Sequence, residues 1–226
     1  LIDEKRILQT YQPVVAMFDD GNDDDKEIYK TGLQAIVEDD ELNNKLVDIS
    51  IFSDSLQQFI NEWSLRQIFL RITESGTSDS KYRFILSATE TWFTEITLFN
   101  WLQKILAQTK KYSPGKSIIL NVPVEIFLKH EKRATALLNT LHKTHYFSIA
   151  LSNINAVDKI PEFCSSTSSK LLMLDIETLK KLSEVLSPQQ EKTDEASDEE
   201  ANEETEKKNL LQYLKQGDVR IMTSGI

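Results

Sequence analysis

The chain has 226 residues, of which 40% are hydrophobic, and a formal net charge of -10 at pH 7. This length and apolar share are typical of one sizeable globular domain or two small ones. The negative charge argues against a general nucleic-acid binder, because such proteins need a basic surface to displace phosphate counterions. A single cysteine, Cys164, excludes an internal disulfide and fits the reducing cytoplasm in which we expect the chain to work.

The N-terminal part of the chain predicts a helix followed by a β-hairpin. Residues 2–10 are predicted to form a short helix, residues 11–18 an apolar strand and residues 27–37 a second strand. The acidic segment 19–25 between the strands contains glycine and is typical of a solvated hairpin turn. Its aspartates do not follow the ligand spacing of an EF-hand loop, so we expect no calcium site there.

Helices and strands then alternate along most of the remaining sequence. Predicted helices cover 54–72, 95–108, 131–143, 176–186 and 210–216, and predicted strands cover 83–87, 117–124, 146–151, 170–174 and 219–223. This alternation is typical of βαβ units that build a mainly parallel sheet. Periodicity alone does not decide between a closed barrel and an open doubly wound sheet. No apolar run in the sequence is long enough to span a bilayer.

Two segments are predicted to be irregular. Residues 188–209 are crowded with acidic side chains and lack aromatic and β-branched aliphatic residues, so they are expected to form a disordered or loosely helical insertion. The serine-rich run 165–169 predicts a flexible loop. Trp63 and Trp101 lie on apolar helix faces and are expected in the core, whereas Trp92 follows a strand, where an exposed ring would line the mouth of the sheet.

Two motifs carry a resemblance to a known family. Tyr11-Gln12-Pro13-Val14-Val15 resembles the first strand, and Ile60-Asn61-Glu62-Trp63-Ser64-Leu65-Arg66 the tryptophan helix, of EAL domains, which bind and hydrolyse cyclic di-GMP in bacteria. The resemblance implies an α/β fold, a modified (β/α)8 TIM-like barrel whose first strand is antiparallel to the others. It covers the chain from Tyr11 onward apart from 188–209, so we expect residues 1–226 to form one EAL-type domain. The closing strand and helix of the family are not recognisable, so we expect a barrel truncated at its C-terminus.

The metal ligands of the family are missing from the matching positions. The resemblance implies two divalent cations, held by carboxylate and amide oxygens at the C-terminal ends of the strands. The residues that stand at these positions are Lys30, Ile85, Asn121, Ser152 and Asn153, and Met173 replaces a phosphate-facing lysine. A small shift in the alignment would recover one ligand, Glu125, but not the whole set.

The retained acid of the family, Asp175, is more typical of a structural carboxylate or loop cap than of a lone metal ligand. We therefore expect a degenerate, catalytically inactive domain that has no catalytic residue, metal site or cofactor. The alternative is an active cyclic di-GMP phosphodiesterase with rearranged metal ligands.

Binding of cyclic di-GMP without hydrolysis is a separate question. Inactive FimX-like relatives hold the ligand through a stacking glutamine, an arginine after the second strand and an acid on the tryptophan helix. The matching residues here are Gln12, Gln34 and Asn61, and with Asp175 they form the candidate ligand-binding set. Loss of the arginine removes a planar fork that pairs with phosphate. We therefore expect weak cyclic di-GMP binding at most.

The loss of those ligand-binding groups favours a protein-interaction scaffold over a nucleotide receptor. By analogy with FimX-like regulators, the resemblance implies a PilZ-domain protein as the partner, and the control of type IV pili and twitching motility as the pathway.

Overall fold

The computed structural model describes residues 7–14, 27–35, 48–74, 82–109, 117–144, 146–154, 159–167, 169, 171–186 and 219–223. Several predicted segments lie outside these residues: the turn at 19–25, the acidic insertion at 188–209 and the helix at 210–216. Residues 2–6 of the predicted N-terminal helix also lie outside them.

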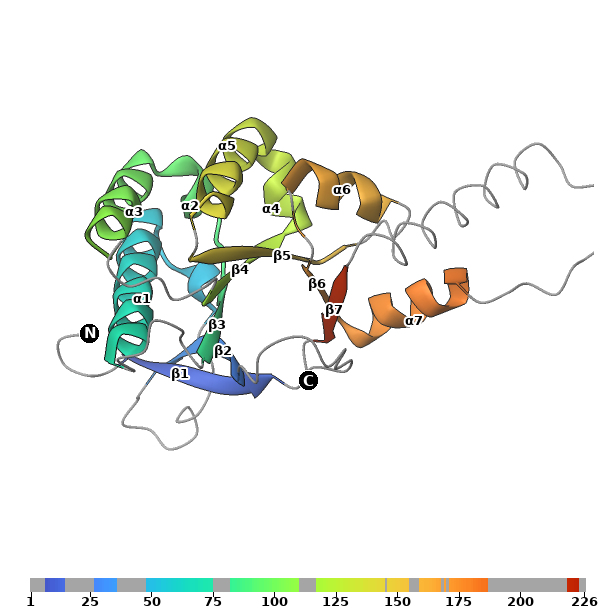
Figure 1. The fold of residues 1–226 in the computed structure, drawn as a ribbon, viewed down its shortest axis with the longest axis horizontal. Coiled ribbons are helices and arrows are strands. Elements are labelled where there is room, and N and C mark those ends of the chain that lie inside the picture. The colour runs from blue at the N-terminus through green and yellow to red at the C-terminus, as the bar shows by residue number, and fades with distance from the viewer. Residues whose placement is uncertain are drawn as a thin grey trace, which may run out of the picture.

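The described strands form one curved sheet of seven strands in chain order (Figure 1). The strands are β1 (Ile7–Val14), β2 (Glu27–Ala35), β3 (Tyr82–Ser87), β4 (Ile118–Pro123), β5 (Phe147–Ser152), β6 (Leu171–Leu174) and β7 (Arg220–Thr223). β1 is antiparallel to β2, and each later strand is parallel to the one before it. The predicted antiparallel first strand is confirmed. Within the described residues β1 and β7 form the two edges of the sheet, as in a truncated TIM-like barrel.

Helices supply the crossovers that parallel strands require, and Figure 1 shows them around the outside of the sheet. They are the short 3-10 helix η1 (Ile49–Ile51), α1 (Asp54–Glu74), α2 (Thr91–Thr94), α3 (Ile96–Thr109), α4 (Val124–Lys129), α5 (Glu131–His142), α6 (Ile160–Thr167) and α7 (Ile176–Leu186). Within the described part of the chain, none of these helices combines the length and the apolar character needed to cross a membrane.

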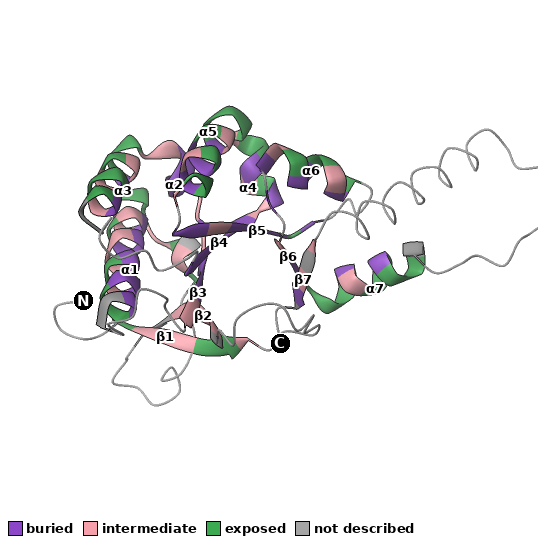
Figure 2. Ribbon diagram, in the orientation of Figure 1, coloured by how far each residue is buried: buried purple, intermediate pink, exposed green. Residues whose placement is uncertain are grey.

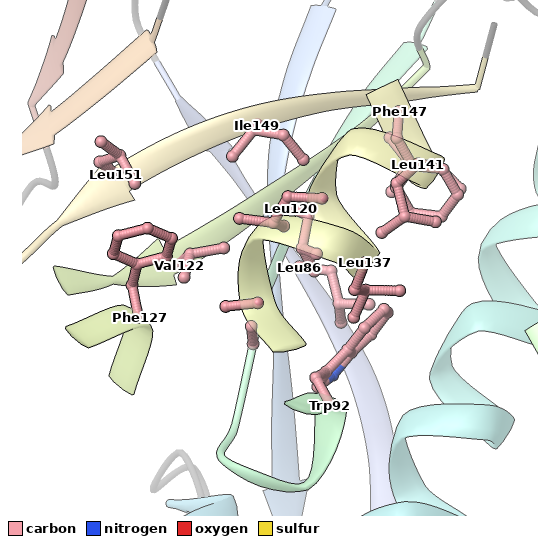
Figure 3. Close-up of a cluster of buried hydrophobic side chains, with 14 of the residues drawn as sticks. Leu86, Trp92, Leu120, Val122, Phe127, Leu137, Leu141, Phe147, Ile149 and Leu151 are labelled. Carbon is pink, nitrogen blue, oxygen red and sulfur yellow. The ribbon is translucent and has the colours of Figure 1, made fainter. Parts of the chain in front are cut away.

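Apolar side chains fill both faces of the sheet, because successive strand residues point to opposite sides. An inner cluster contains Ile85, Ile119, Ala150, Met173 and Met222. A larger outer cluster lies between the strands and the helices, and Figure 3 labels members of it, including Leu86, Leu120, Phe127, Leu137 and Ile149. Strand β4 is therefore buried on both faces, and Figure 2 shows it as one of the most buried segments. This explains its continuous apolar sequence.

The N-terminal helix prediction is wrong for residues 7–10. These residues begin β1, which pairs with β2 from Ile7 opposite Ala35 to Val14 opposite Ile28. The ladder with β2 runs along the whole segment, and Tyr11 packs edge-on against Phe84 at a centroid distance of 5.6 Å. Long-range pairing therefore overrides the local helical pattern.

The flexible loop predicted for the serine run 165–169 is wrong for residues 165–167, and residue 168 lies outside the described residues. Helix α6 extends through Thr167, and its buried residues Ile160, Phe163, Cys164 and Thr167 follow helical spacing. Ser169 is buried as well, and its hydroxyl donates to the Ile149 carbonyl at 2.8 Å. The Ser166 hydroxyl likewise donates to the Glu162 carbonyl at 2.9 Å, so these two serines are accommodated by hydrogen bonds to backbone carbonyls.

Trp92 is a member of the outer cluster and does not line the mouth of the sheet. Its side chain is 2% exposed, and Figure 3 shows the ring lying beside Leu86 and Leu137. The one-turn helix α2, which was not predicted from the sequence, places Trp92 between β3 and α5. An exposed aromatic contact for a partner is therefore absent at this position.

Phe127 and Leu128 are adjacent residues of α4 that differ sharply in burial, at 2% and 53% exposure. Changing Phe127 to Ala should lower the free energy of unfolding by about 3–5 kcal/mol, because it leaves a cavity in the outer cluster. The matched change Leu128→Ala should cost less than about 1 kcal/mol. Urea unfolding of the two variants measures the difference, and equal losses would contradict the assignment of the outer core.

Candidate functional site

A cavity of about 800 Å³ lies at the C-terminal ends of β2, β3 and β4, where barrel proteins place their functional sites. The strand ends contribute Thr31, Gly32, Leu86, Ser87, Ala88 and Pro123. The segment before α1 and α1 itself contribute Ile49, Phe52, Gln57 and Ser64. The cavity therefore lies on the side of the strand ends that faces α1.

Asn153, which matches one of the family's metal-binding aspartates, also lines the cavity. It directly follows β5, is exposed and has a backbone φ of 55°. Asparagine is one of the few residues other than glycine that tolerate this left-handed conformation. Asn153 therefore lies just beyond the strand, at the cavity.

The charged residues that line the cavity are the acids Asp48, Asp54, Glu90 and Glu125, and no lysine or arginine is among the described lining residues. Glu125, the acid that an alignment shift would recover as a ligand, lies on α4 beyond the end of β4. A cavity of this charge disfavours an anionic ligand by direct repulsion. Asp48, Asp54 and Glu90 were not predicted as site residues, because separate connections of the fold bring them to the cavity.

Glu90 ties the turn after β3 to the junction of α4 and α5. Its Oε1 lies 2.7 Å from Lys129 Nζ and 2.7 Å from His130 Nε2. Hydrogen bonds with these two side chains lower the pKa of Glu90, and the bond with Lys129 has the larger effect. The Glu90 carboxylate, at the rim of the cavity, thus links the segment after β3 to the segment between α4 and α5.

The inner face of the sheet carries most of the positions at which the family would place metal ligands. Strand register sets Lys30 beside Ile85 and Ile85 beside Ile119. In the next row across the sheet, Ser87 of β3, Asn121 of β4 and Ala150 of β5 lie side by side. In the last row, Ser152 of β5, Met173 of β6 and Met222 of β7 lie side by side. Directly paired residues project to the same face. The inner layer at the strand ends therefore holds ammonium, hydroxyl, amide and apolar groups.

Metal-binding side chains do not gather anywhere in the described residues. No group of three or more histidine, cysteine, aspartate or glutamate side chains in that part of the chain could hold a metal ion. The oxygens that the inner layer does offer, from Ser87, Asn121 and Ser152, are neutral. Hard divalent cations bind chiefly to carboxylates.

Asn61, the candidate guanine-reading position, has a structural function in this fold. It is completely buried, and its amide nitrogen donates to the Thr89 hydroxyl at 3.0 Å and to the Thr91 hydroxyl at 3.1 Å. The two hydroxyls also lie 2.8 Å apart and share a hydrogen bond. Asn61 thereby anchors α1 to the segment between β3 and α2, and it is not among the residues that line the cavity.

The other candidate ligand residues are spread along the sheet. Gln12 is exposed on β1, opposite Lys30 of β2. Gln34 lies near the C-terminal end of β2 and pairs through its backbone with Leu8 of β1. Asp175 follows β6, where its Oδ1 accepts the Thr178 backbone N–H at 2.6 Å. This contact caps α7 and agrees with the loop-cap interpretation. Neither Gln12 nor Asp175 lines the cavity.

Comparison with known proteins identifies the architecture. No family model matches the chain, and no curated protein matches it by sequence. The structure is similar to the FimX EAL domain of Pseudomonas aeruginosa bound to c-di-GMP, with 14% identity, a TM-score of 0.59, and coverage of 98% of this chain and 90% of that chain. The chain has the fold of an EAL domain.

Two further EAL-type structures give the same result. The FimX EAL domain of Xanthomonas citri in complex with c-diGMP has 14% identity and a TM-score of 0.61, and the match covers 98% of this chain and 78% of that one. The PaMucR phosphodiesterase in its c-di-GMP complex has 13% identity and a TM-score of 0.61, with 100% and 83% covered. The same EAL fold thus serves both a phosphodiesterase and other c-di-GMP-binding domains, so function depends on the side chains.

The α7 cap makes the stability of this EAL fold depend on pH. Hydrogen bonds from Thr178, first its backbone N–H and then its hydroxyl, lower the pKa of Asp175 from its ordinary value of 3.8. A carboxyl with a lowered pKa in the folded state stabilises the fold above its unfolded pKa and loses this contribution as the pH falls. Asp175→Ala should therefore lower Tm by a few degrees at pH 7, and the difference should shrink below pH 3.8.

Asp175→Asn is the matched control for this prediction, because asparagine is a good helix cap without a titrating charge. It should keep most of the stability at pH 7 and lose the dependence on pH. Thermal unfolding followed by circular dichroism between pH 3 and pH 7 measures both effects. An alanine variant that melts with the wild type at every pH would show that the cap contributes nothing.

Proposed function

We propose that the chain is a catalytically inactive EAL-type signalling domain that acts as a receptor or protein-interaction scaffold in a cyclic di-GMP pathway. The observation that carries this proposal is the inner layer at the strand ends, where Lys30, Ile85, Ser152 and Met173 face inward. The fold neighbours support the pathway, since their structures are EAL domains with c-di-GMP bound.

The chemistry of that layer argues against hydrolysis. Cleavage of a phosphodiester by two bound cations requires ligands that hold both ions beside the attacking and leaving oxygens. Ile85 and Met173 offer no oxygen, and they are 0% and 4% exposed in an apolar cluster. The Lys30 ammonium adds a positive charge that would repel a dication at the same place.

A scaffold fits the described site better than a nucleotide receptor does. The cavity is lined by four acids, Asp48, Asp54, Glu90 and Glu125, and by no described lysine or arginine. Asn61, which would have to read a guanine edge, is buried and hydrogen-bonded to two threonines instead. Binding of cyclic di-GMP by Gln12, Gln34, Asn61 and Asp175 should therefore be weak.

The partner that we propose is a PilZ-domain protein, and the setting is the cytoplasmic control of type IV pili and twitching motility. This part of the proposal is supported by the fold similarity to two FimX EAL domains. The competing function, an active phosphodiesterase with rearranged ligands, is supported by the similarity to PaMucR. The two functions differ in one direct measurement.

Purified protein incubated with cyclic di-GMP and either Mg²⁺ or Mn²⁺ should release no linear dinucleotide, because the inner layer lacks carboxylates to hold the ions. Chromatography of the nucleotides against an active EAL phosphodiesterase measures this. Turnover that disappears in both Asn121→Ala and Glu125→Ala, while the surface variant Lys104→Ala retains it, would establish the rearranged enzyme and overturn the proposal.

A further inference from the structure

The cavity at the C-terminal ends of β2, β3 and β4 carries a negative charge. The acids among its described lining residues are Asp48, Asp54, Glu90 and Glu125. Asp54 and Glu125 lie in the first turns of α1 and α4, where a helix N-terminus favours an acid. Each helix end supplies only about half an elementary positive charge, so these two carboxylates still leave the cavity negative.

The acids are too dispersed to form a metal site. Within the described part of the chain, no group of three histidine, cysteine, aspartate or glutamate side chains could hold a metal ion. The cavity has a volume of about 800 Å³, which is within the range of roughly 300–1,000 Å³ that is usual for pockets that bind organic molecules. An extended organic cation therefore suits this cavity better than a metal ion does.

Ser64 of α1 is a second and independent indication of a ligand. It lines the cavity and is only 3% exposed, yet its hydroxyl makes no hydrogen bond to another described residue. Two other lining hydroxyls are bonded within the protein, because Thr31 donates to the Ile85 carbonyl at 2.8 Å and Thr89 accepts from the Asn61 amide at 3.0 Å. Buried polar groups usually have a partner. Ser64 therefore offers the cavity a hydroxyl that a ligand can satisfy.

Apolar side chains form another part of the cavity wall. They are Ile49, Phe52, Leu86 and Ile126. A wall of this kind suits the methylene stem of a long basic side chain whose charged end contacts the carboxylates. The Phe52 ring also offers a face on which a guanidinium group can stack. Arginine fits better than lysine, because its weakly hydrated, planar guanidinium presents five N–H donors to several acceptors at once.

We propose that this cavity binds an arginine side chain from a basic segment of a partner protein. The acids supply the negative charge, the Ser64 hydroxyl accepts a hydrogen bond from the guanidinium, and the apolar wall holds the methylene stem. This inference deepens the proposed function, because it gives the chemistry by which the scaffold binds its partner. It rests on that function for the partner being a protein.

Two matched peptides test the charge requirement of the site. One is acetyl-Gly-Arg-Gly-Arg-Gly-amide, and in the other each arginine is replaced by citrulline, which carries a neutral urea of nearly the same shape. Titrations followed by two-dimensional amide NMR spectra measure both affinities. The citrulline peptide should bind at least about tenfold more weakly, because charge-assisted hydrogen bonds to the carboxylates are lost.

Three variants test whether the arginine peptide binds in this cavity. Ser64→Ala should weaken binding about threefold or more through loss of a hydrogen bond. It should not lower Tm of the free protein, because alanine removes an unsatisfied hydroxyl and favours the helix. Asp54→Asn, which keeps a side chain that can cap α1, should weaken binding about threefold, since Asp54 is exposed. The control Glu184→Gln removes an exposed acid of α7 outside the described lining and should leave binding unchanged.

Several results would overturn the arginine site. They are absence of arginine-peptide binding, equal binding of the citrulline peptide, wild-type affinity in Ser64→Ala, and equal losses in Asp54→Asn and Glu184→Gln, which would indicate unspecific attraction to an acidic chain. Failure of the proposed function has a different signature. Peptide binding that depends on Ser64, together with hydrolysis of cyclic di-GMP, would support the site and refute the inactive scaffold. Absence of both would overturn the site and leave the inactive domain in place.

Discussion

In-register pairing of the parallel strands decides what can happen at their C-terminal ends. Each inward-facing residue lies beside the inward-facing residue of the next strand, so one level of the sheet runs from Lys30 through Ile85 to Ile119. A site at this place needs compatible groups on several strands at once. One apolar residue at a ligand position removes one ligand of the metal ion, and one positively charged side chain repels any metal ion that binds nearby.

The inner cluster shows what apolar side chains contribute at the inner face of the strand ends. Carboxylates that converge without a metal repel one another and raise each other's pKa. A buried apolar residue at a ligand position, such as Ile85, causes no such repulsion and adds apolar burial, which contributes about 25 cal/mol per Å². Apolar residues at these positions stabilise the fold, whereas metal binding requires polar ligands there. In this chain the inner cluster is apolar and favours stability.

The sequence predicts the parallel part of the fold well, because each strand there has its own apolar run. Strand β4 and helix α7 lie where the pattern places them, α7 with the same bounds of Ile176–Leu186. The sequence pattern mispredicts Ile7–Thr10 as a helix, because the ladder with β2 decides their conformation. It also misses α2, α4 and α6, which are too short for a clear periodic signal. The site was only partly predictable: register places Lys30 and Ile85 together, but the hydrogen bonds of Asn61 to Thr89 and Thr91 join residues remote in sequence.

We propose that the strand ends of this EAL fold hold no divalent cations. The most direct test is an anomalous-scattering map from crystals of the chain grown with Mn²⁺ and cyclic di-GMP, because such a map locates each ion and separates inner-face sites from acids on the surface. We predict no Mn²⁺ peak within coordination distance of Asn121 or Ser152, which lie on the inner face of β4 and β5. Two Mn²⁺ peaks at that position, bridged by phosphate oxygens of the nucleotide, would show that the strand ends do form a two-metal site.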